Sequence, residues 1–469
     1  MTRVTFTILE EQRALLQRSI FRDESEYAAL LLCGRSRSRD PWTGEEEERI
    51  VAREIIEVPE SAFIKRSPVG FTWSTAPFYQ AVKRAEPQNF AVAVIHSHPA
   101  GYLRFSSADD IAEKETFEIA FNRLDSDRPH LSLIMTPDGQ LAGRAYGLNL
   151  KPRSVDMIRV LGRRWRFTYS EVNTETARPA FDRQVRAFGQ QSTLDLSQLR
   201  IGVVGCGGTG SAVAALLARI GVRHLALFDT DFIDETNLNR LHYSTRTDAN
   251  LRRLKVDVLG EAIAGIGLPI SVARIPHHVE DIEARDALKS CDVVFGCTDD
   301  HLGRNVLNRL AHFYFVPIID LGLLIDPRSG GGYDAFDGRV TVVQPGSPCQ
   351  VCRGLIKSDI MLDEGLRRKD PAVYEQRRRA GYVADAADPS PVVVTFTTEV
   401  ATMAVNELFQ RLNVFRGDNG AASERVRRFD EVKEADLLPS GKSRLGCKLC
   451  DRRRYDGRGD MDPFLDTTS

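Results

Sequence analysis

Residues 201–230 read IGVVGCGGTGSAVAALLARIGVRHLALFDT. An apolar strand from Ile201 to Val204 runs into a glycine-rich turn, and an apolar helical stretch, Ser211–Ile220, leads to a second strand, His224–Phe228. Strand, turn, helix and strand in this order form a βαβ unit, whose strands pair in parallel within a sheet that helices cover on both faces. The stretch therefore predicts a doubly wound, Rossmann-like α/β fold around it.

The chain on the N-terminal side of this unit contains further apolar runs. Ala28–Cys33, Phe90–Ile95 and Leu131–Met135 are short and bounded by turn residues, which indicates buried strands of a separate α/β domain. A segment rich in Arg, Ser and Thr separates the two regions and predicts a connector or docking segment. The predicted divisions are a first domain at 1–150, a connector at 151–180, a second domain at 181–455 and a polar tail at 456–469.

The composition excludes several classes of protein. The chain has 469 residues, 42% hydrophobic and 27% charged, which is typical of globular proteins with more than one domain. Its 63 Lys and Arg nearly balance 65 Asp and Glu, so we expect no nucleic-acid partner. We expect no membrane partner either, because no apolar run approaches 18 residues, and we expect a cytoplasmic protein. In a reducing compartment the eight cysteines are metal ligands or packed thiols rather than disulfides.

A first candidate site lies in the N-terminal domain. His96 and His98 end an apolar run, and residues two apart on a strand share a face, so both rings can reach one ion. Asp109 begins a predicted helix and can add an oxygen ligand. Two His, one carboxylate and an open position are typical of catalytic zinc. Glu26, with Glu24 as the competitor, is the predicted proton shuttle, and the hydroxyl of Ser106 can stabilise an oxyanion.

This arrangement of Glu, His-x-His-Pro and Ser-x-x-Asp resembles the JAMM family of metalloproteases, also called JAB or MPN-plus, over residues 1 to 150. The resemblance implies a JAB-like α/β domain that cleaves after the C-terminal glycine of a ubiquitin-like protein. It also implies that His96, His98 and Asp109 bind zinc, that Glu26 is the general acid and base, and that Ser106 stabilises the oxyanion.

A second candidate site begins at the glycine-rich turn. The spacing of Gly205, Gly207 and Gly210 alone is equally typical of a nicotinamide dehydrogenase. The residues that follow favour a nucleoside triphosphate with magnesium. Asp229 at the end of a strand can hold a ribose, Arg240 and Lys255 can contact phosphates, and Asp299 at another strand end can bind magnesium.

These motifs resemble the ThiF/MoeB/ubiquitin-activating enzyme family over residues 180 to 455. In that family the C-terminal carboxylate of a ubiquitin-like protein attacks the α-phosphate of ATP, giving an acyl-adenylate and pyrophosphate. The resemblance implies an arginine finger, Arg183, that reaches the ATP of a partner subunit, and hence a homodimer. The implied ATP-binding residues are Gly205, Gly207, Gly208, Gly210, Asp229, Asp231, Asn237, Arg240, Lys255, Asp299 and Asp300.

Four cysteines form two C-x-x-C pairs, Cys349 with Cys352 and Cys447 with Cys450. Two such pairs predict one closed, structural zinc site with four thiolates, as the ThiF-type family also has. The alternative, a redox C-x-x-C, is disfavoured because two pairs occur in one domain. The expected cofactors are therefore two zinc ions, one catalytic and one structural, and ATP with magnesium.

The sequence departs from the ThiF-type pattern at several positions. Many family members carry a cysteine after the first C-x-x-C that accepts the activated tail, but residues 353–390 contain none. Either the adenylate passes directly to a separate acceptor, which we favour, or a hydroxyl such as Ser358 or Ser390 replaces the thiol. Leu241 stands in place of the usual Gln, and Asp300 in place of the usual Asn.

The combined prediction is a bifunctional enzyme of a ubiquitin-like protein pathway. One domain exposes or releases a C-terminal glycine, by precursor processing or by deconjugation, and the other adenylates it. The alternative is activation of a sulfur carrier for thiocarboxylate-based cofactor or cysteine synthesis. A conjugating enzyme would be a further partner in the first case and a sulfurtransferase in the second. A scaffold without activity conflicts with two sites that are complete in sequence.

Overall fold

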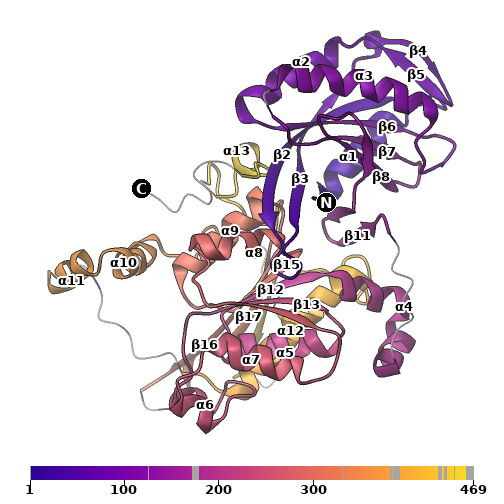
Figure 1. The fold of residues 1–469 in the computed structure, drawn as a ribbon. Helices are drawn as coiled ribbons and strands as arrows, with labels where there is room; N and C mark the ends of the chain where they lie inside the picture. Colours follow the sequence, from indigo (N-terminus) through magenta and orange to yellow (C-terminus); the bar gives the residue numbers. More distant parts are fainter. Residues whose placement is uncertain are drawn as a thin grey trace.

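The computed structural model of this protein contains two large mixed sheets, one in each half of the chain, with helices packed around them (Figure 1). The sheet of the N-terminal half lies at the top of Figure 1 and that of the C-terminal half at the bottom. The structure describes residues 2–124, 126–171, 179–329, 331–380, 383, 391–430, 436–437, 441–447 and 449–460.

The first sheet has nine strands in the order β11-β10-β1-β3-β2-β6-β7-β8-β9, and β4 and β5 form a separate hairpin. Its interior strands are buried on both faces, which accounts for the continuous apolar runs of the sequence. The elements are β1 (Arg3–Leu9), α1 (Glu10–Ile20), β2 (Ala28–Arg39), β3 (Glu46–Glu57), η1 (Glu60–Ala62), β4 (Phe63–Ser67), β5 (Gly70–Trp73), α2 (Ala76–Ala85), η2 (Glu86–Gln88), β6 (Ala91–Ser97), α3 (Ser107–Arg123), β7 (His130–Met135), β8 (Leu141–Tyr146), β9 (Pro152–Ser154), β10 (Met157–Leu161) and β11 (Arg166–Tyr169).

The second sheet has the order β14-β13-β12-β15-β16-β17-β18-β19. The strands from β14 to β16 are parallel, and those from β17 onward are antiparallel. The elements are η3 (Pro179–Phe181), α4 (Asp182–Gln198), β12 (Arg200–Val204), α5 (Gly208–Arg219), β13 (His224–Phe228), η4 (Glu235–Asn237), α6 (Arg246–Asn250), α7 (Lys255–Ala264), β14 (Ser271–Ile275), α8 (Ile282–Ser290), β15 (Val293–Gly296), α9 (His301–Phe313), β16 (Ile318–Pro327), β17 (Tyr333–Val343), α10 (Ser358–Lys369), α11 (Pro371–Arg379), α12 (Val394–Asn413), β18 (Glu424–Arg428), β19 (Asp436–Leu437) and α13 (Arg452–Tyr455).

Helices cover both faces of the second sheet, which confirms the predicted doubly wound fold. One apolar cluster joins the sheet to α5, α7 and α12, and another joins it to α8 and α9. The predicted strands Ile201–Val204 and His224–Phe228 lie in β12 and β13, and the helix after the glycine turn starts earlier than Ser211, at Gly208. The three apolar runs of the first domain form β2, β6 and β7.

The structure differs from the sequence prediction in two segments. The predicted connector at 151–180 contains β9, β10 and β11, and β10 pairs in parallel with β1 inside the first sheet. The side chain of Trp165 is buried, and its backbone N–H donates to the carbonyl of Arg411 in α12 (2.8 Å). The predicted polar tail at 456–469 is packed rather than frayed as far as Asp460, since it contacts both domains, and 461–469 lie outside the described residues.

The β2–β3 hairpin crosses from the first domain to the second (Figure 1). The indole N–H of Trp42, near its tip, donates to the carbonyl of Leu225 in β13 (3.0 Å). The hydroxyl of Ser290 in α8 lies 3.2 Å from that of Ser38 in β2. The second domain's main apolar cluster also includes Leu9, Val51 and Leu161 of the first domain. The two domains therefore share one packed junction.

Charged side chains are buried at this junction, in what we call the interdomain ion cluster. Glu47 of β3 lies within ion-pair distance of Arg159 (3.4 Å) and Arg200 (2.6 Å), and Asp292 lies 2.7 Å from Arg159. Asp292 also accepts a hydrogen bond from the backbone N–H of Arg200 (3.0 Å). The cluster consists of Arg3, Asp40, Glu47, Arg49, Arg159, Arg200 and Asp292.

The arginines keep the carboxyl groups of Glu47 and Asp292 ionised. Burial alone would raise the pKa of Asp292, but Arg159, Arg49 and other nearby arginines outweigh it and hold that pKa below its ordinary value. The same balance lowers the pKa of Glu47. A carboxyl group whose pKa is lowered by folding stabilises the fold above its unfolded-state pKa, and that contribution is lost as the pH falls through the folded-state value.

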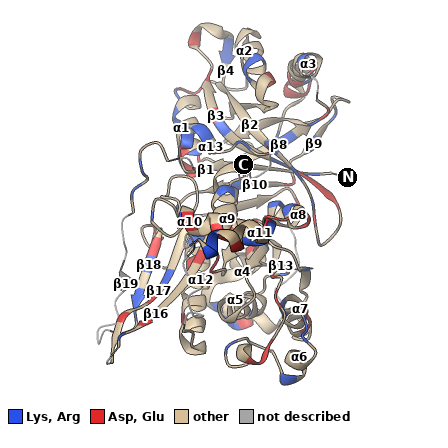
Figure 2. Ribbon diagram, turned by 90° about the vertical axis from the view of Figure 1, so that its left-hand side faces the viewer, with Lys and Arg blue, Asp and Glu red and all other residues tan. Residues whose placement is uncertain are grey.

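Charges of both signs are interspersed elsewhere, as the near-balanced composition suggests (Figure 2). Across the part of the chain that the structure describes, no helix is both long and apolar enough to span a membrane.

We expect Asp292→Asn to destabilise the protein by about 3 to 5 kcal/mol, because it leaves buried arginines without their counter-charge. Chemical denaturation would measure this, and the variant should also lose part of the native fall in stability below about pH 4. The matched control is Glu375→Gln, which removes the surface ion pairs with Arg378 and Arg379 and should leave the stability nearly unchanged. An Asp292→Asn variant as stable as the control would contradict the role of the cluster.

Candidate active sites

The first site lies where β6 ends beside the start of α3. The Nε2 atoms of His96 and His98 are 3.0 Å apart, and the Nε2 atom of His96 lies 3.5 Å from Oδ1 of Asp109. Ligand atoms around one tetrahedral zinc, at bond lengths of about 2.0–2.1 Å, are about 3.3–3.4 Å apart. The three predicted ligands therefore come together in an arrangement that fits one zinc ion.

Each histidine presents a ring nitrogen to the proposed metal position. Burial lowers the pKa of His96 to about 4 and outweighs the opposing charge of Asp109, so its imidazole is neutral at pH 7. The Nδ1 atom of His98 lies 2.7 Å from the carbonyl oxygen of Tyr102, which leaves Nε2 for the metal.

Glu26 lies two residues before β2, which pairs with β6 so that Ala28 is opposite His96. Its side chain is buried, and burial together with the charge of Asp109 raises its pKa to about 8. Glu24, the competing candidate, is exposed. The geometry therefore favours Glu26 as the carboxyl group that exchanges protons at this site.

Ser106 occupies the N-cap position of α3. Its Oγ donates to Oδ2 of Asp109 (2.8 Å) and accepts from the backbone N–H of Asp109 (3.2 Å). This capping box fixes the first turn of the helix and orients the carboxylate of Asp109. The predicted role of Ser106 as an oxyanion stabiliser stays a prediction beside this structural one.

The sequence analysis missed a buried network that holds α3 in place. Glu113, one turn after Asp109, accepts hydrogen bonds from Ser132 of β7 (2.6 Å) and from Arg144 (2.6 Å) and Tyr146 (2.8 Å) of β8. The guanidinium of Arg144 stacks on the ring of Phe105 at 4.0 Å. Glu113 lies four residues after Asp109 and so on the same face of the helix. This spacing is the signal from which the network could have been predicted.

The second site surrounds the glycine loop between β12 and α5. Gly205 has φ of +87°, a left-handed conformation that favours glycine, and a Cβ at Gly210 would overlap the carbonyl oxygen of Gly205. A Cβ at Gly207 would meet nothing within 4 Å, so this part of the loop is open. The chain can therefore approach a phosphate closely at the N-terminus of α5.

Asp229 follows β13 and connects the glycine loop to the turn that contains Asp231. Its Oδ2 accepts from the N–H of Cys206 (2.6 Å) and its Oδ1 from the N–H of Asp231 (2.8 Å). Asp231 in turn lies 2.6 Å from Nζ of Lys255. Burial would lower the pKa of Lys255, but the carboxylates of Asp229 and Asp231 outweigh it and raise that pKa. Asp229 and Asp231 therefore hold the ammonium group of Lys255 beside the glycine loop.

Arg240 also reaches the loop, since its aliphatic carbons lie 3.4–3.5 Å from the position of a Cβ at Gly208. Its guanidinium donates to the side-chain oxygen of Asn239 (3.2 Å). Asn237 ends η4, and its side-chain oxygen accepts from the N–H of Asp234 (3.3 Å). Asn237 therefore shapes the turn that delivers Arg240.

Asp299 and Asp300 lie in the turn after β15, which contacts the glycine loop through Cys297. Asp299 is exposed. The carboxylate of Asp300 caps α9 by accepting from the N–H of Gly303 (3.0 Å), and it pairs with Arg368 of α10 (2.9 Å). Its predicted contact with ATP would therefore compete with these partners, which the sequence did not indicate.

Arg183 lies exposed near the start of α4, the helix that precedes β12. The residues between the first C-x-x-C and α12 form two helices, α10 and α11, and Ser358 is the first, exposed residue of α10. Ser390 lies outside the described residues. Burial raises the pKa of both Cys206 and Cys297, which fits packed thiols rather than nucleophiles.

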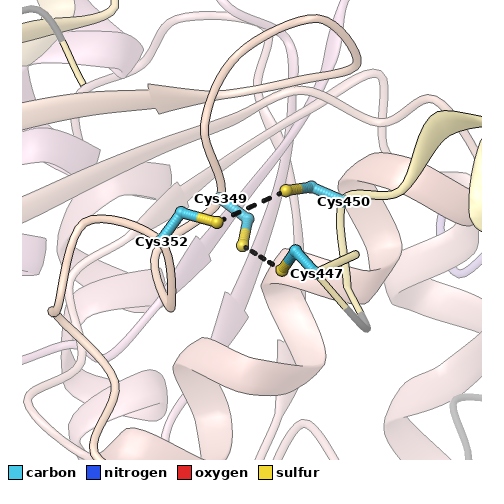
Figure 3. A group of neighbouring side chains, drawn as sticks. All are labelled: Cys349, Cys352, Cys447 and Cys450. Carbon is cyan, nitrogen blue, oxygen red and sulfur yellow. Dashed lines mark hydrogen bonds between the residues drawn. The ribbon is translucent and has the colours of Figure 1, made fainter. Parts of the chain in front are cut away.

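The four cysteines of the two C-x-x-C pairs converge beside α9 (Figure 3). The Sγ atoms of Cys349 and Cys447 are 3.7 Å apart, and those of Cys352 and Cys450 are 3.6 Å apart. Thiolates around a tetrahedral zinc, with Zn–S bonds of about 2.3 Å, are about 3.8 Å apart. The cysteines fit one closed zinc site.

Comparison with known proteins assigns both halves of the chain. Residues 181–445 match the model of the ThiF family, and residues 8–146 match the model described as prokaryotic homologs of the JAB domain.

Two curated relatives illustrate the match. Molybdopterin-synthase adenylyltransferase of Escherichia coli (strain K12) is 30% identical over 176 residues, which are 37% of this chain and 66% of the relative. The SAMP-activating enzyme E1 of Haloferax volcanii is 26% identical over 153 residues, 33% of this chain and 52% of the relative. The chain thus spans less than two thirds of the length of either relative.

Among solved structures, that of Escherichia coli MccB with ATP is similar over 60% of this chain and 76% of the MccB chain, with a TM-score of 0.44 and 16% sequence identity.

The match to the ThiF family model alone covers more than half of the chain. The chain therefore belongs to the ThiF family, and its N-terminal half carries a domain similar to prokaryotic homologs of JAB.

Proposed function

We propose that the second domain adenylates the C-terminal glycine of a ubiquitin-like or sulfur-carrier protein with ATP. The observation that carries this proposal is the convergence of Arg240, Lys255 and the turn bearing Asp299 on an open glycine loop. Relatives named as adenylyltransferase and activating enzyme support it. In the proposed reaction a carboxylate oxygen bonds to the α-phosphorus, and the bond to pyrophosphate breaks.

Each residue has a role in this proposal. Asp229 holds the ribose, and the glycine loop places backbone N–H groups against phosphate. Asn237, Arg240 and Lys255 contact the phosphates, whose charge the two cations balance, and Asp299 holds magnesium. Asp231 orients Lys255, to which it is bonded at 2.6 Å. Arg183 acts from the partner subunit of a homodimer, as its exposed position on α4 allows.

The carrier protein that is adenylated can be of two kinds, a ubiquitin-like modifier or a sulfur carrier. A ubiquitin-like modifier is favoured by the peptidase-like first domain and by the relative named SAMP-activating enzyme E1. A sulfur carrier is favoured by the relative named molybdopterin-synthase adenylyltransferase. In both cases we favour transfer of the adenylate to a separate acceptor, since residues 353–390 contain no cysteine, and a hydroxyl such as that of Ser358 or Ser390 is the alternative.

We propose that the first domain cleaves the peptide or isopeptide bond after the same glycine. Zinc at His96, His98 and Asp109 would supply a water molecule with a pKa near 7. With zinc bound, Glu26 in its ionised form would take a proton from the water and pass it to the leaving amine, and Ser106 would face the developing oxyanion. Tyr102 and Ile111, next to the ligands in sequence, are 72% and 67% exposed, which supports a protein substrate.

The first test concerns adenylation. The protein should exchange radiolabelled pyrophosphate into ATP only with a carrier that ends in a free glycine. Asp299→Ala should lower the exchange at least about 100-fold through lost magnesium, a loss of roughly 3 kcal/mol of transition-state stabilisation. Ser358→Ala is the matched control and should exchange normally. Normal exchange by Asp299→Ala would overturn the assignment.

The second test concerns the homodimer. Arg183→Ala and Asp299→Ala should each be inactive, but mixing them should restore part of the activity, because one site of each mixed dimer contains both groups. Exchange activity as a function of the mixing ratio measures this. A protein that stays monomeric at the assay concentration would exclude the proposed role of Arg183.

The third test concerns hydrolysis. Glu26→Gln should abolish cleavage of a carrier extended beyond its glycine while metal analysis still gives close to two zinc ions per chain, because Glu26 moves protons without binding the metal. Glu24→Gln is the control and should cleave normally. Cleavage by Glu26→Gln, or native protein with one zinc ion, would exclude the proposed hydrolase.

A further inference from the structure

Residues Arg452–Asp460, which we call the C-terminal strap, connect the second domain to the first. The strap begins two residues after Cys450. The ring of Tyr455 stacks on Phe313 at the end of α9, with centroids 5.7 Å apart and an interplanar angle of 8°. Oδ1 of Asp456 lies 2.8 Å from Nδ1 of the buried His312. The first half of the strap is thus bound to α9.

The second half of the strap is bound to β2 of the first domain. The backbone N–H of Asp460 donates to the carbonyl of Arg35 (2.6 Å), and its carboxylate accepts from the backbone N–H of Arg37 (2.7 Å). The Nζ atom of Lys289, in α8, lies 3.1 Å from the same carboxylate. Two elements, β2 of the first domain and α8 of the second, therefore meet on Asp460.

The strap also completes the end of α9. The N–H groups of Gly457 and Gly459 donate to the carbonyls of His312 and Phe313, both at 2.9 Å. The last carbonyls of a helix lack partners within the helix, so the strap supplies hydrogen bonds that α9 cannot make itself.

Glycine is required at the closest contacts. Gly457 and Gly459 have φ of +67° and +68°. A Cβ at Gly459 would overlap backbone atoms of Arg35, and a Cβ at Gly34 would overlap the carbonyl oxygen of Gly457. The two backbones lie too close for any other residue, so this is a specific docking surface rather than a chance contact.

The four-cysteine site lies at the base of the strap. One of its pairs, Cys447 and Cys450, immediately precedes the strap. The other pair is attached to α9, because the N–H of Gln350 donates to the side chain of Asn308 (3.1 Å). A metal that binds all four thiolates would therefore fix the start of the strap beside the helix on which it docks.

We propose that zinc in the four-cysteine site controls the docking of the strap between the domains, so that loss of this zinc releases residues 456–460 from α9 and β2. The proposal rests on the structural zinc put forward above and on neither enzymatic activity. The interdomain ion cluster does not involve the strap and remains in place. Release is therefore confined to the strap and to the segment of β2 that it contacts.

The experiment is hydrogen exchange by mass spectrometry on the full chain, with zinc content measured on the same samples. Cys450→Ser removes a ligand next to the strap and Cys352→Ser removes one distant from it in sequence. Both should lose one zinc per chain, and the amides of Gly457, Gly459 and Asp460 should exchange at least about tenfold faster in both. Amides of β12 should keep their protection, which shows that the fold is intact.

Two controls define the readout. His98→Ala should lose the zinc of the first domain while the strap stays protected. Gly459→Ala should release the strap while both zinc ions remain. Should the cysteine variants not fold, titrating the native protein with a chelator and restoring zinc gives the same comparison, with reversible loss of strap protection expected.

Three results would overturn the proposal. These are strap protection that survives loss of the second zinc, release in Cys450→Ser but not in Cys352→Ser, and a native protein that binds no zinc at the four cysteines. Absence of peptidase or adenylation activity would exclude the proposed functions instead, since none of these measurements depends on turnover.

Discussion

The interdomain ion cluster is the interaction on which the arrangement of the whole chain depends. Arg49 and Arg159 belong to the first domain, and Asp292, which pairs with both, belongs to the second. Separating the domains would break the ion pairs of both arginines with Asp292, and water would have to solvate the separated charges. A buried pair is not by itself strongly stabilising, but breaking one is costly. The cluster therefore specifies how the two domains dock.

The same cluster is linked to the nucleotide site through the strands that begin at it. Arg200 is the first residue of β12, whose other end is the glycine loop, and Asp292 precedes β15, whose other end leads to Asp299. Both strands run in parallel and are only four or five residues long. The junction therefore positions the two turns that contact each other through Gly205 and Cys297.

The sequence predicted the features whose residues lie close together along the chain. The glycine loop, the His-x-His pair and the two C-x-x-C pairs each combine local spacing with one type of chemistry, and the structure brings each set together. The domain junction could not be predicted in this way, because Glu47 and Arg200 are distant in sequence and only the fold makes them neighbours.

The two segments that were assigned wrongly share a cause. Residues 151–171 resembled a connector because they are rich in Arg, yet Arg159 is buried against a carboxylate of the other domain. The segment 456–469 was predicted as a tail because it is polar, yet Asp456 and Asp460 both have partners in the fold. Polarity indicates exposure only where no opposite charge from elsewhere in the fold meets it.

The three glycines where the strap meets β2 indicate how the two domains of this chain could have evolved together or apart. Gly34 lies in β2 of the first domain, and Gly457 and Gly459 lie in the strap. A Cβ at Gly34 or Gly459 would overlap the facing backbone, and both strap glycines also adopt positive φ. A peptidase-like domain encoded by a gene of its own would have no need of a glycine at the position of Gly34. Among related proteins, joint presence of all three would mark chains in which the two halves have evolved as one unit, and their joint loss would mark those that separated.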